Sequence, residues 1–74
     1  MTLSEFNNLE VDEKAAAAMH GNFIDVRSEE GMKVALYSLP NFYAEVFYDG
    51  ESNRIARCRA FTSVTPLAAY IRLT

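Results

Sequence analysis

The stretch that decides the fold runs from Phe42 to Thr62 and reads FYAEVFYDGESNRIARCRAFT. Its two flanks are rich in aromatic and apolar residues that alternate with polar ones, whereas the segment DGESN between them consists of turn formers. We therefore predict an antiparallel hairpin with one strand over residues 42–48 and the next over residues 54–62.

Charge and side-chain size predict the register of this hairpin. A register that sets opposite charges beside each other gives one face with aromatic and charged residues and another face with mostly apolar ones. The cross-strand pairs expected on the first face are Glu45 with Arg57, Tyr43 with Arg59, and Phe47 with Ile55. The second face carries Ala44, Val46, Ala56, Cys58 and Ala60. Because most of these side chains are small, we expect a helix to pack closely over that face.

The sequence outside residues 42–62 predicts three helices and two more strands. Thr2 and Glu5 have the spacing of a capping box, which favours a first helix over residues 3–8. Acidic residues before the run AAAAM favour a second helix from about Val11 to His20, ended by Gly21 with a positive φ. Strands are expected over 23–26 and 32–39, and Thr65 followed by proline favours a last helix over about 65–71.

These elements predict an α+β fold. We expect a two-layer domain in which the N-terminal helices and the C-terminal helix pack on one face of a four-stranded antiparallel meander. With 74 residues, the chain buries only roughly 60% of its unfolded surface, so residues 1–74 are expected to form a single small domain. Its composition, half hydrophobic and 23% charged, is typical of a globular protein.

The location is predicted from the cysteine content and the first residues. The lone Cys58 cannot form an intramolecular disulfide, which favours a reducing compartment. No signal-peptide pattern follows Met1 and no apolar run is long enough to cross a bilayer. We therefore expect a cytoplasmic protein with no membrane partner.

Charge is distributed unevenly along the chain. Residues 1–31 carry seven acidic and two basic residues, a balance of −5, whereas residues 32–74 carry three acidic and five basic residues, a balance of +2. The net charge of −3 provides no overall field to hold a polyanion, although it permits a local basic patch.

An exposed sheet face opposite the helices is the candidate site. Its expected members are aromatic, aliphatic and charged residues: Tyr37, Leu39, Tyr43, Glu45, Phe47, Ile55, Arg57, Arg59 and Phe61. Monomers rarely expose so much apolar area, so a protein contact is favoured, first of all a homodimer that pairs this face with itself. In a second interpretation the aromatic residues shield one another and Glu45 neutralises Arg57.

Single-stranded nucleic acid is the alternative ligand for this face. Arg54, Arg57 and Arg59 alternate with aromatic side chains on which bases could stack. The acidic total and the position of Glu45 inside the patch disfavour this interpretation, because neutralisation of phosphates supplies most of the non-specific affinity.

Enzymatic chemistry is not predicted. Cys58 is expected to be buried among alanines as an inert thiol with a raised pKa, and Asp25 and Glu45 have no spacing that indicates an acid–base pair. His20 is expected to end a helix rather than bind a metal, since it is the only histidine. The three glycines form no phosphate loop, and we expect no catalytic residue, no metal and no cofactor.

The segment FYAEVFYDGESNRIARCRAF, preceded by FNNLEVDEKAAAAMHG and followed by TPLAAYI, resembles a family of short stand-alone bacterial proteins of unassigned function. The likeness covers most of the chain, and its most specific part is the pattern N-x-I-x-R-x-R-x-F from Asn53 to Phe61. The resemblance implies the fold type and a cytoplasmic bacterial setting. It assigns no catalytic residue.

Overall fold

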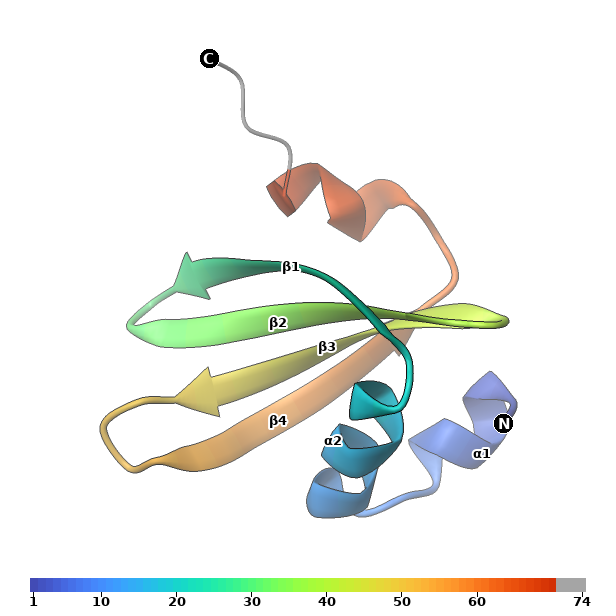
Figure 1. Ribbon diagram of the computed structural model, residues 1–74, viewed down its shortest axis with the longest axis horizontal. Coiled ribbons are helices and arrows are strands. Elements are labelled where there is room, and N and C mark those ends of the chain that lie inside the picture. The colour runs from blue at the N-terminus through green and yellow to red at the C-terminus, as the bar shows by residue number, and fades with distance from the viewer. Residues whose placement is uncertain (71–74) are drawn as a thin grey trace.

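The computed structural model of the chain describes residues 1–70, which form a four-stranded sheet with helices on both sides (Figure 1). The elements in chain order are α1 (Leu3–Asn7), α2 (Val11–Met19), β1 (Asn22–Glu29), β2 (Met32–Leu39), β3 (Phe42–Asp49), β4 (Arg54–Phe61) and the 3-10 helix η1 (Thr65–Tyr70). The predicted α+β class and the antiparallel meander are confirmed. No helix within residues 1–70 is long and apolar enough to span a bilayer.

The sheet has the order β1-β2-β3-β4, with every neighbour antiparallel. Two-residue loops join β1 to β2 and β2 to β3. In the first loop Glu30 and Gly31 have φ angles of 49° and 82°, as a type I′ turn requires. This tight turn lets β1 pair with β2 as far as Glu29, so the strand extends beyond the 23–26 predicted for it.

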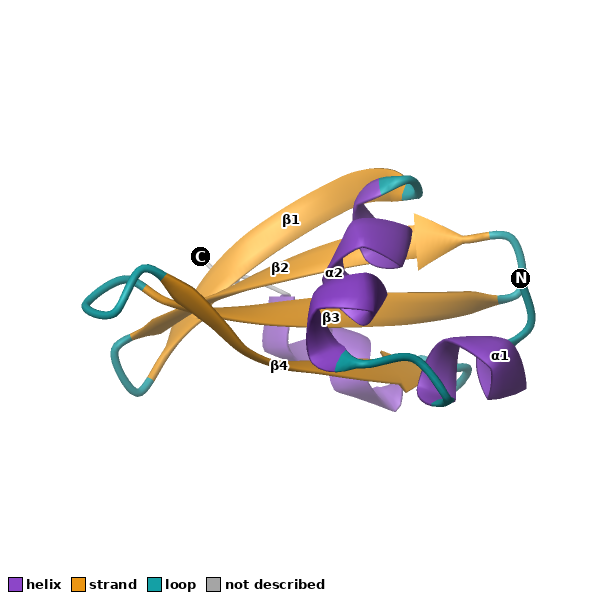
Figure 2. Cartoon of the chain, turned by 90° about the horizontal axis from the view of Figure 1, so that it is seen from below, coloured by secondary structure: helices purple, strands orange, loops and turns teal. Residues whose placement is uncertain are grey.

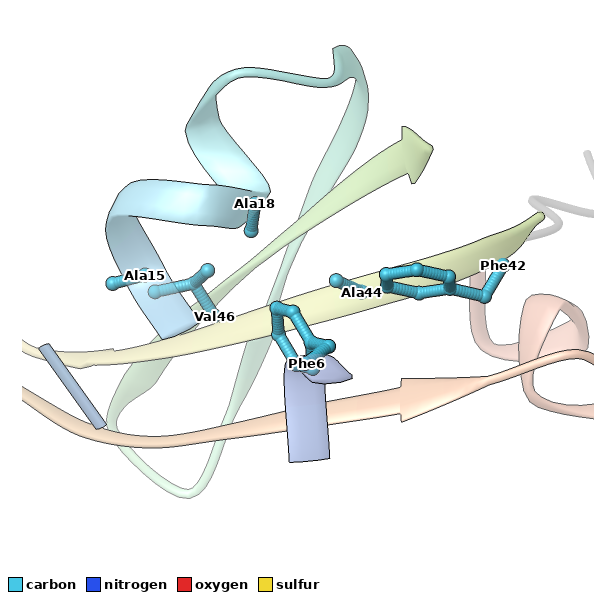
Figure 3. Close-up of a cluster of buried hydrophobic side chains, with 6 residues drawn as sticks. All are labelled: Phe6, Ala15, Ala18, Phe42, Ala44 and Val46. Carbon is cyan, nitrogen blue, oxygen red and sulfur yellow. The ribbon is translucent and has the colours of Figure 1, made fainter. Parts of the chain in front are cut away.

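Helices α1 and α2 cover one face of the sheet, which we call the helix face. The predicted capping box is present, since the Thr2 hydroxyl accepts from the Glu5 amide and the Glu5 carboxylate accepts from the Thr2 amide. His20 is the C-cap of α2, as predicted. Beneath the helices lies the core of Figure 3, which contains Phe6, Ala15, Ala18, Phe42, Ala44 and Val46.

Gly21 ends α2 for a reason that differs from the prediction. Its φ is not positive, and Gly31 is the glycine with a positive φ in the described part of the chain. A Cβ atom on Gly21 would lie 2.6 Å from the Ser38 carbonyl oxygen. Glycine is therefore needed here because the chain leaving α2 passes very close to the backbone of β2.

The C-terminal helix lies on the opposite side of the sheet from the prediction. Figure 2 shows η1 behind the sheet and α2 in front of it. Helix η1 packs against β1, and the Tyr70 hydroxyl bonds to Glu45, whose side chain points away from the helix face. The expectation that all helices share one face is therefore wrong for this element. Ile71, the last residue expected in that helix, lies outside the described residues.

The register of β3 and β4 also differs from the prediction. Glu45 lies opposite Arg59 and Phe47 lies opposite Arg57, a shift of two residues that leaves both arginines on the predicted face. Between Phe47 and Tyr48 the pairing shifts again, so that Tyr48 lies opposite Ile55 and Ala56 is the extra residue of a β-bulge.

Candidate functional site

The face opposite α1 and α2 carries the arginines of the sheet, and we call it the arginine face. Strand pairing places on it side chains from all four strands: Arg27, Val34, Leu36, Tyr43, Glu45, Phe47, Arg57, Arg59 and Phe61. Its centre is buried, because Val34, Leu36, Glu45 and Phe47 are each at most 1% exposed. The expected open aromatic face is thus already covered at its centre within one chain.

Glu45 is the hub of a buried polar cluster. Its Oε1 accepts from Arg59 Nε at 2.9 Å and also from Arg59 Nη2, and its Oε2 accepts from Arg27 Nη2 at 3.3 Å and from the Tyr70 hydroxyl at 2.6 Å. These four residues, Arg27, Glu45, Arg59 and Tyr70, form what we call the Glu45 cluster. Both carboxylate oxygens are satisfied, which is the condition for burying a charge at tolerable cost.

The cluster fixes the ionisation of its members. Burial by itself would raise the pKa of Glu45, but the hydrogen bonds from Tyr70 and Arg59 and the charges of Arg59 and Arg27 outweigh it and lower the pKa below its usual 4.5. Burial and the nearby carboxylate raise the pKa of Tyr70, so its hydroxyl remains a neutral donor. Glu45 is consequently an acceptor of hydrogen bonds and has no proton to give near neutral pH.

Guanidinium groups cover the aromatic ring at the centre of the face. The Arg57 guanidinium carbon lies 3.9 Å from the centroid of the Phe47 ring, and Arg27 lies 5.9 Å from the same centroid. Arg27 also lies 5.5 Å from the Tyr70 ring. Cation–π contacts of this kind let charged side chains shield an apolar ring while their N–H groups remain directed to solvent or to acceptors.

A second aromatic group lies toward one end of β3 and β4. Tyr43 and Phe61 stack with centroids 5.7 Å apart, and Arg59 lies 5.3 Å from the Phe61 ring. Arg57 is exposed, and within residues 1–70 it has no carboxylate at ion-pair distance. We call Tyr43, Arg57, Arg59 and Phe61 the β3–β4 strip.

Three predicted members of the face lie elsewhere. Tyr37, Leu39 and Ile55 pack against the core on the helix face. The two-residue loop at Pro40 and Asn41 sets Tyr37 opposite Ala44, which puts both on one face, and the bulge at Ala56 reverses the side on which Ile55 points. The predicted face is therefore correct for Tyr43, Glu45, Phe47, Arg57, Arg59 and Phe61 and wrong for these three.

Cys58 lies on the helix face, as predicted, although it is opposite Val46 rather than Ala44. It is half-buried, and its thiol lies 3.7 Å from the Val11 carbonyl oxygen. Burial raises the pKa of the Cys58 thiol, so the unreactive protonated form dominates near neutral pH.

Arg27 and Tyr70 are the members of the Glu45 cluster that sequence reasoning missed. Arg27 comes from the edge strand β1 and also pairs with Glu29 at 3.3 Å, and Tyr70 comes from η1. The tight turn after Glu29 signals that β1 reaches Arg27, and strand alternation then places that residue beside Val34. Nothing in the sequence indicates the side of the sheet on which Tyr70 lies.

We found no protein-family model, curated protein or solved structure that matches the chain. The family resemblance suggested by Asn53–Phe61 stays a prediction.

Proposed function

We propose that the chain is a small protein-binding domain and that the β3–β4 strip is its contact surface. The observation that carries the proposal is the state of Arg57, which is exposed, stacked on Phe47 and without a carboxylate partner in residues 1–70. Arginine and aromatic side chains supply much of the energy of protein interfaces. The contacts with Phe47 and Glu45 restrain Arg57 and Arg59 before any partner binds, which reduces the entropy lost on binding.

The strip fits a different protein better than a second copy of the chain. In the homodimer expected from the sequence, Glu45 of each copy would pair with arginines of the other. Glu45 is fully buried and already accepts hydrogen bonds from three side chains, so it cannot form an ion pair with an arginine of a second copy. A two-fold contact between strips would also place like charges close together.

Homodimerisation through this face stays a prediction, and sedimentation at micromolar concentration tests it. Tyr43→Glu is the suitable variant, because Phe47→Glu would place a charge in a site that is 1% exposed and would damage the fold. A dimer that Tyr43→Glu dissociates and that Lys14→Glu leaves intact would favour self-association. If the original chain and both variants sediment as monomers, the result would favour binding to a different protein over self-association. Cytoplasmic location likewise stays a prediction, based on the single cysteine.

Single-stranded nucleic acid is the second candidate ligand. The stacked Tyr43–Phe61 pair beside Arg57 and Arg59 favours it, since bases stack on aromatic side chains and arginines contact phosphates. The net charge of −3 and the neutralisation of Arg59 by Glu45 weaken the attraction for a polyanion. Titration of labelled oligonucleotides at low salt separates the candidates, and binding that Arg54→Ala and Arg57→Ala weaken would favour nucleic acid.

The main test of the proposed function is affinity capture from a cell lysate with three baits. These are the original chain, Arg57→Glu, and Lys33→Glu, which changes an exposed strand cation on the helix face. We expect a protein that the original chain and Lys33→Glu retain and that Arg57→Glu loses. Circular dichroism of the three baits checks that they are equally folded. Capture that does not respond to Arg57→Glu would contradict the proposed surface.

A further inference from the structure

Strand β4 is an edge of the sheet with unused pairing capacity. It has one neighbouring strand, β3, and within residues 1–70 its backbone makes no hydrogen bond to any other segment. The outward N–H and C=O groups of an edge strand can pair with another strand. Helices α1 and α2 pack against β4 on the helix face, and η1 packs against the other edge strand, β1.

The side chains of this edge are strongly basic. Arg54, Arg57 and Arg59 are all exposed, and β4 contains no acidic residue. Like charges on an edge strand oppose its pairing with an identical strand from a second copy. The same charges attract a strand of opposite charge, so the edge discriminates between partners.

The part of β4 that pairs regularly with β3 is short, but it is long enough for one more strand to pair along it. The bulge at Ala56 interrupts the ladder, and the five residues from Arg57 to Phe61 follow it without a further shift. Strands of about five or six residues are the commonest in proteins. Within this part Arg57, Arg59 and Phe61 face the arginine side, and Cys58 and Ala60 face the helix side.

We propose that β4 binds an extended acidic segment of a partner protein by strand addition along Arg57–Phe61. Alternate residues of the added strand point to the same face, so two carboxylates two positions apart meet Arg57 and Arg59. An apolar residue two positions further lies beside Phe61, and the intervening residues adjoin Cys58 and Ala60. Backbone hydrogen bonds supply affinity, and the charged pairs supply specificity. The inference rests on the proposed function, since it names the chemistry of the protein partner.

The recognition chemistry follows from the state of the two arginines. Arg57 has no carboxylate partner in the described chain, and its planar guanidinium can bind a carboxylate through two parallel hydrogen bonds. Arg59 already donates to Glu45, yet 43% of its side chain is exposed. Arg57 is thus expected to be the main determinant, with Arg59 as an auxiliary contact.

Titration of the isotope-labelled full chain with a blocked peptide of sequence TEVEVFT, followed by amide NMR shifts, tests the proposal. We expect the largest shifts at residues 57–61 and at least about a tenfold weaker Kd for Arg57→Glu, with no change for Lys33→Glu. A peptide with lysine in place of glutamate should not bind. The proposal is overturned if the lysine peptide binds equally well or if no binding occurs at millimolar concentration.

Two further peptides separate strand addition from charge attraction alone. Each is TEVEVFT with N-methyl groups on alternate backbone amides, one peptide on the odd positions and the other on the even positions. A strand presents only every second amide to the edge it joins, so we expect one of the two to bind and the other to fail. Equal binding by both would overturn strand addition. If no acidic peptide binds but Arg57→Glu still loses a captured protein, the proposed function stands and this inference fails.

Discussion

The two faces of the sheet are closed to water in different ways. On the helix face, aromatic and alanine side chains of α1 and α2 pack against β3, and Phe6 and Phe42 lie with ring centroids 5.3 Å apart. On the arginine face, Val34, Leu36 and Phe47 are equally buried, beneath arginine side chains and Tyr70. A sheet face can therefore be kept dry by guanidinium groups when those groups have a buried carboxylate to hold them.

The largest expected effect is the destabilisation of the helix face by Phe6→Ala. Phe6 is fully buried, and removal of its ring should lower the free energy of unfolding by about 3–5 kcal/mol. Urea denaturation measures the loss, which should be nearly the same at pH 4 and pH 7 because the Phe6 ring is apolar and carries no charge. A loss below about 1 kcal/mol would show that the site collapses to fill the cavity.

Glu45→Gln should destabilise the arginine face and lower the free energy of unfolding by about 3 kcal/mol at neutral pH. The change removes the buried carboxylate from Arg27, which is only 16% exposed and retains its ion pair with Glu29. Because the pKa of Glu45 is lowered in the folded state, its contribution is present above the usual 4.5 and is lost as the pH falls through the folded value.

Urea denaturation of the original chain and of Glu45→Gln should therefore give stabilities that differ most near pH 7 and begin to converge as the pH falls below the usual 4.5. Glu51→Gln, at an exposed turn position, is the matched control and should change little at either pH. A difference that stays constant from pH 7 to pH 3 would contradict the ionised state of Glu45.

A smaller effect is expected from Tyr70→Phe, which removes one donor from Glu45 and keeps the ring over Arg27. The loss should be about 1.5–3 kcal/mol, the range for a hydrogen bond to a charged group. Tyr48→Phe is the matched control, because Tyr48 is exposed and its hydroxyl bonds to Asn53 in the neighbouring turn. Equal effects of the two changes in urea denaturation would show that η1 does not depend on Glu45.

Much of the secondary structure could be predicted because it depends on local chemistry. The capping box of Thr2 and Glu5 and the turn formers after Asp49 place the ends of α1 and β4 within about a residue. The two-sided character of β3 also follows from its alternating pattern. These features need no knowledge of distant residues.

The misplaced parts of the candidate site depend on long-range geometry. The bulge at Ala56 changes the face of Ile55, and no residue there has the positive φ or the glycine that would signal a bulge. The side of the sheet on which η1 lies depends on the hydrogen bond from Tyr70 to the carboxylate of Glu45, 25 positions earlier in the chain. The sequence could reveal the arginines of the face but could not show that its centre is buried.

The Glu45 cluster also bears on the order of events in folding. Its contacts join residues separated by 14, 18 and 25 positions, so they require the meander and the crossing to η1 to be in place. Local elements such as α2 and the Glu30–Gly31 turn can form before these contacts do. Interactions absent from the transition state mainly govern the unfolding rate. The cluster is thus expected to prolong the lifetime of the folded state while leaving the folding rate almost unchanged.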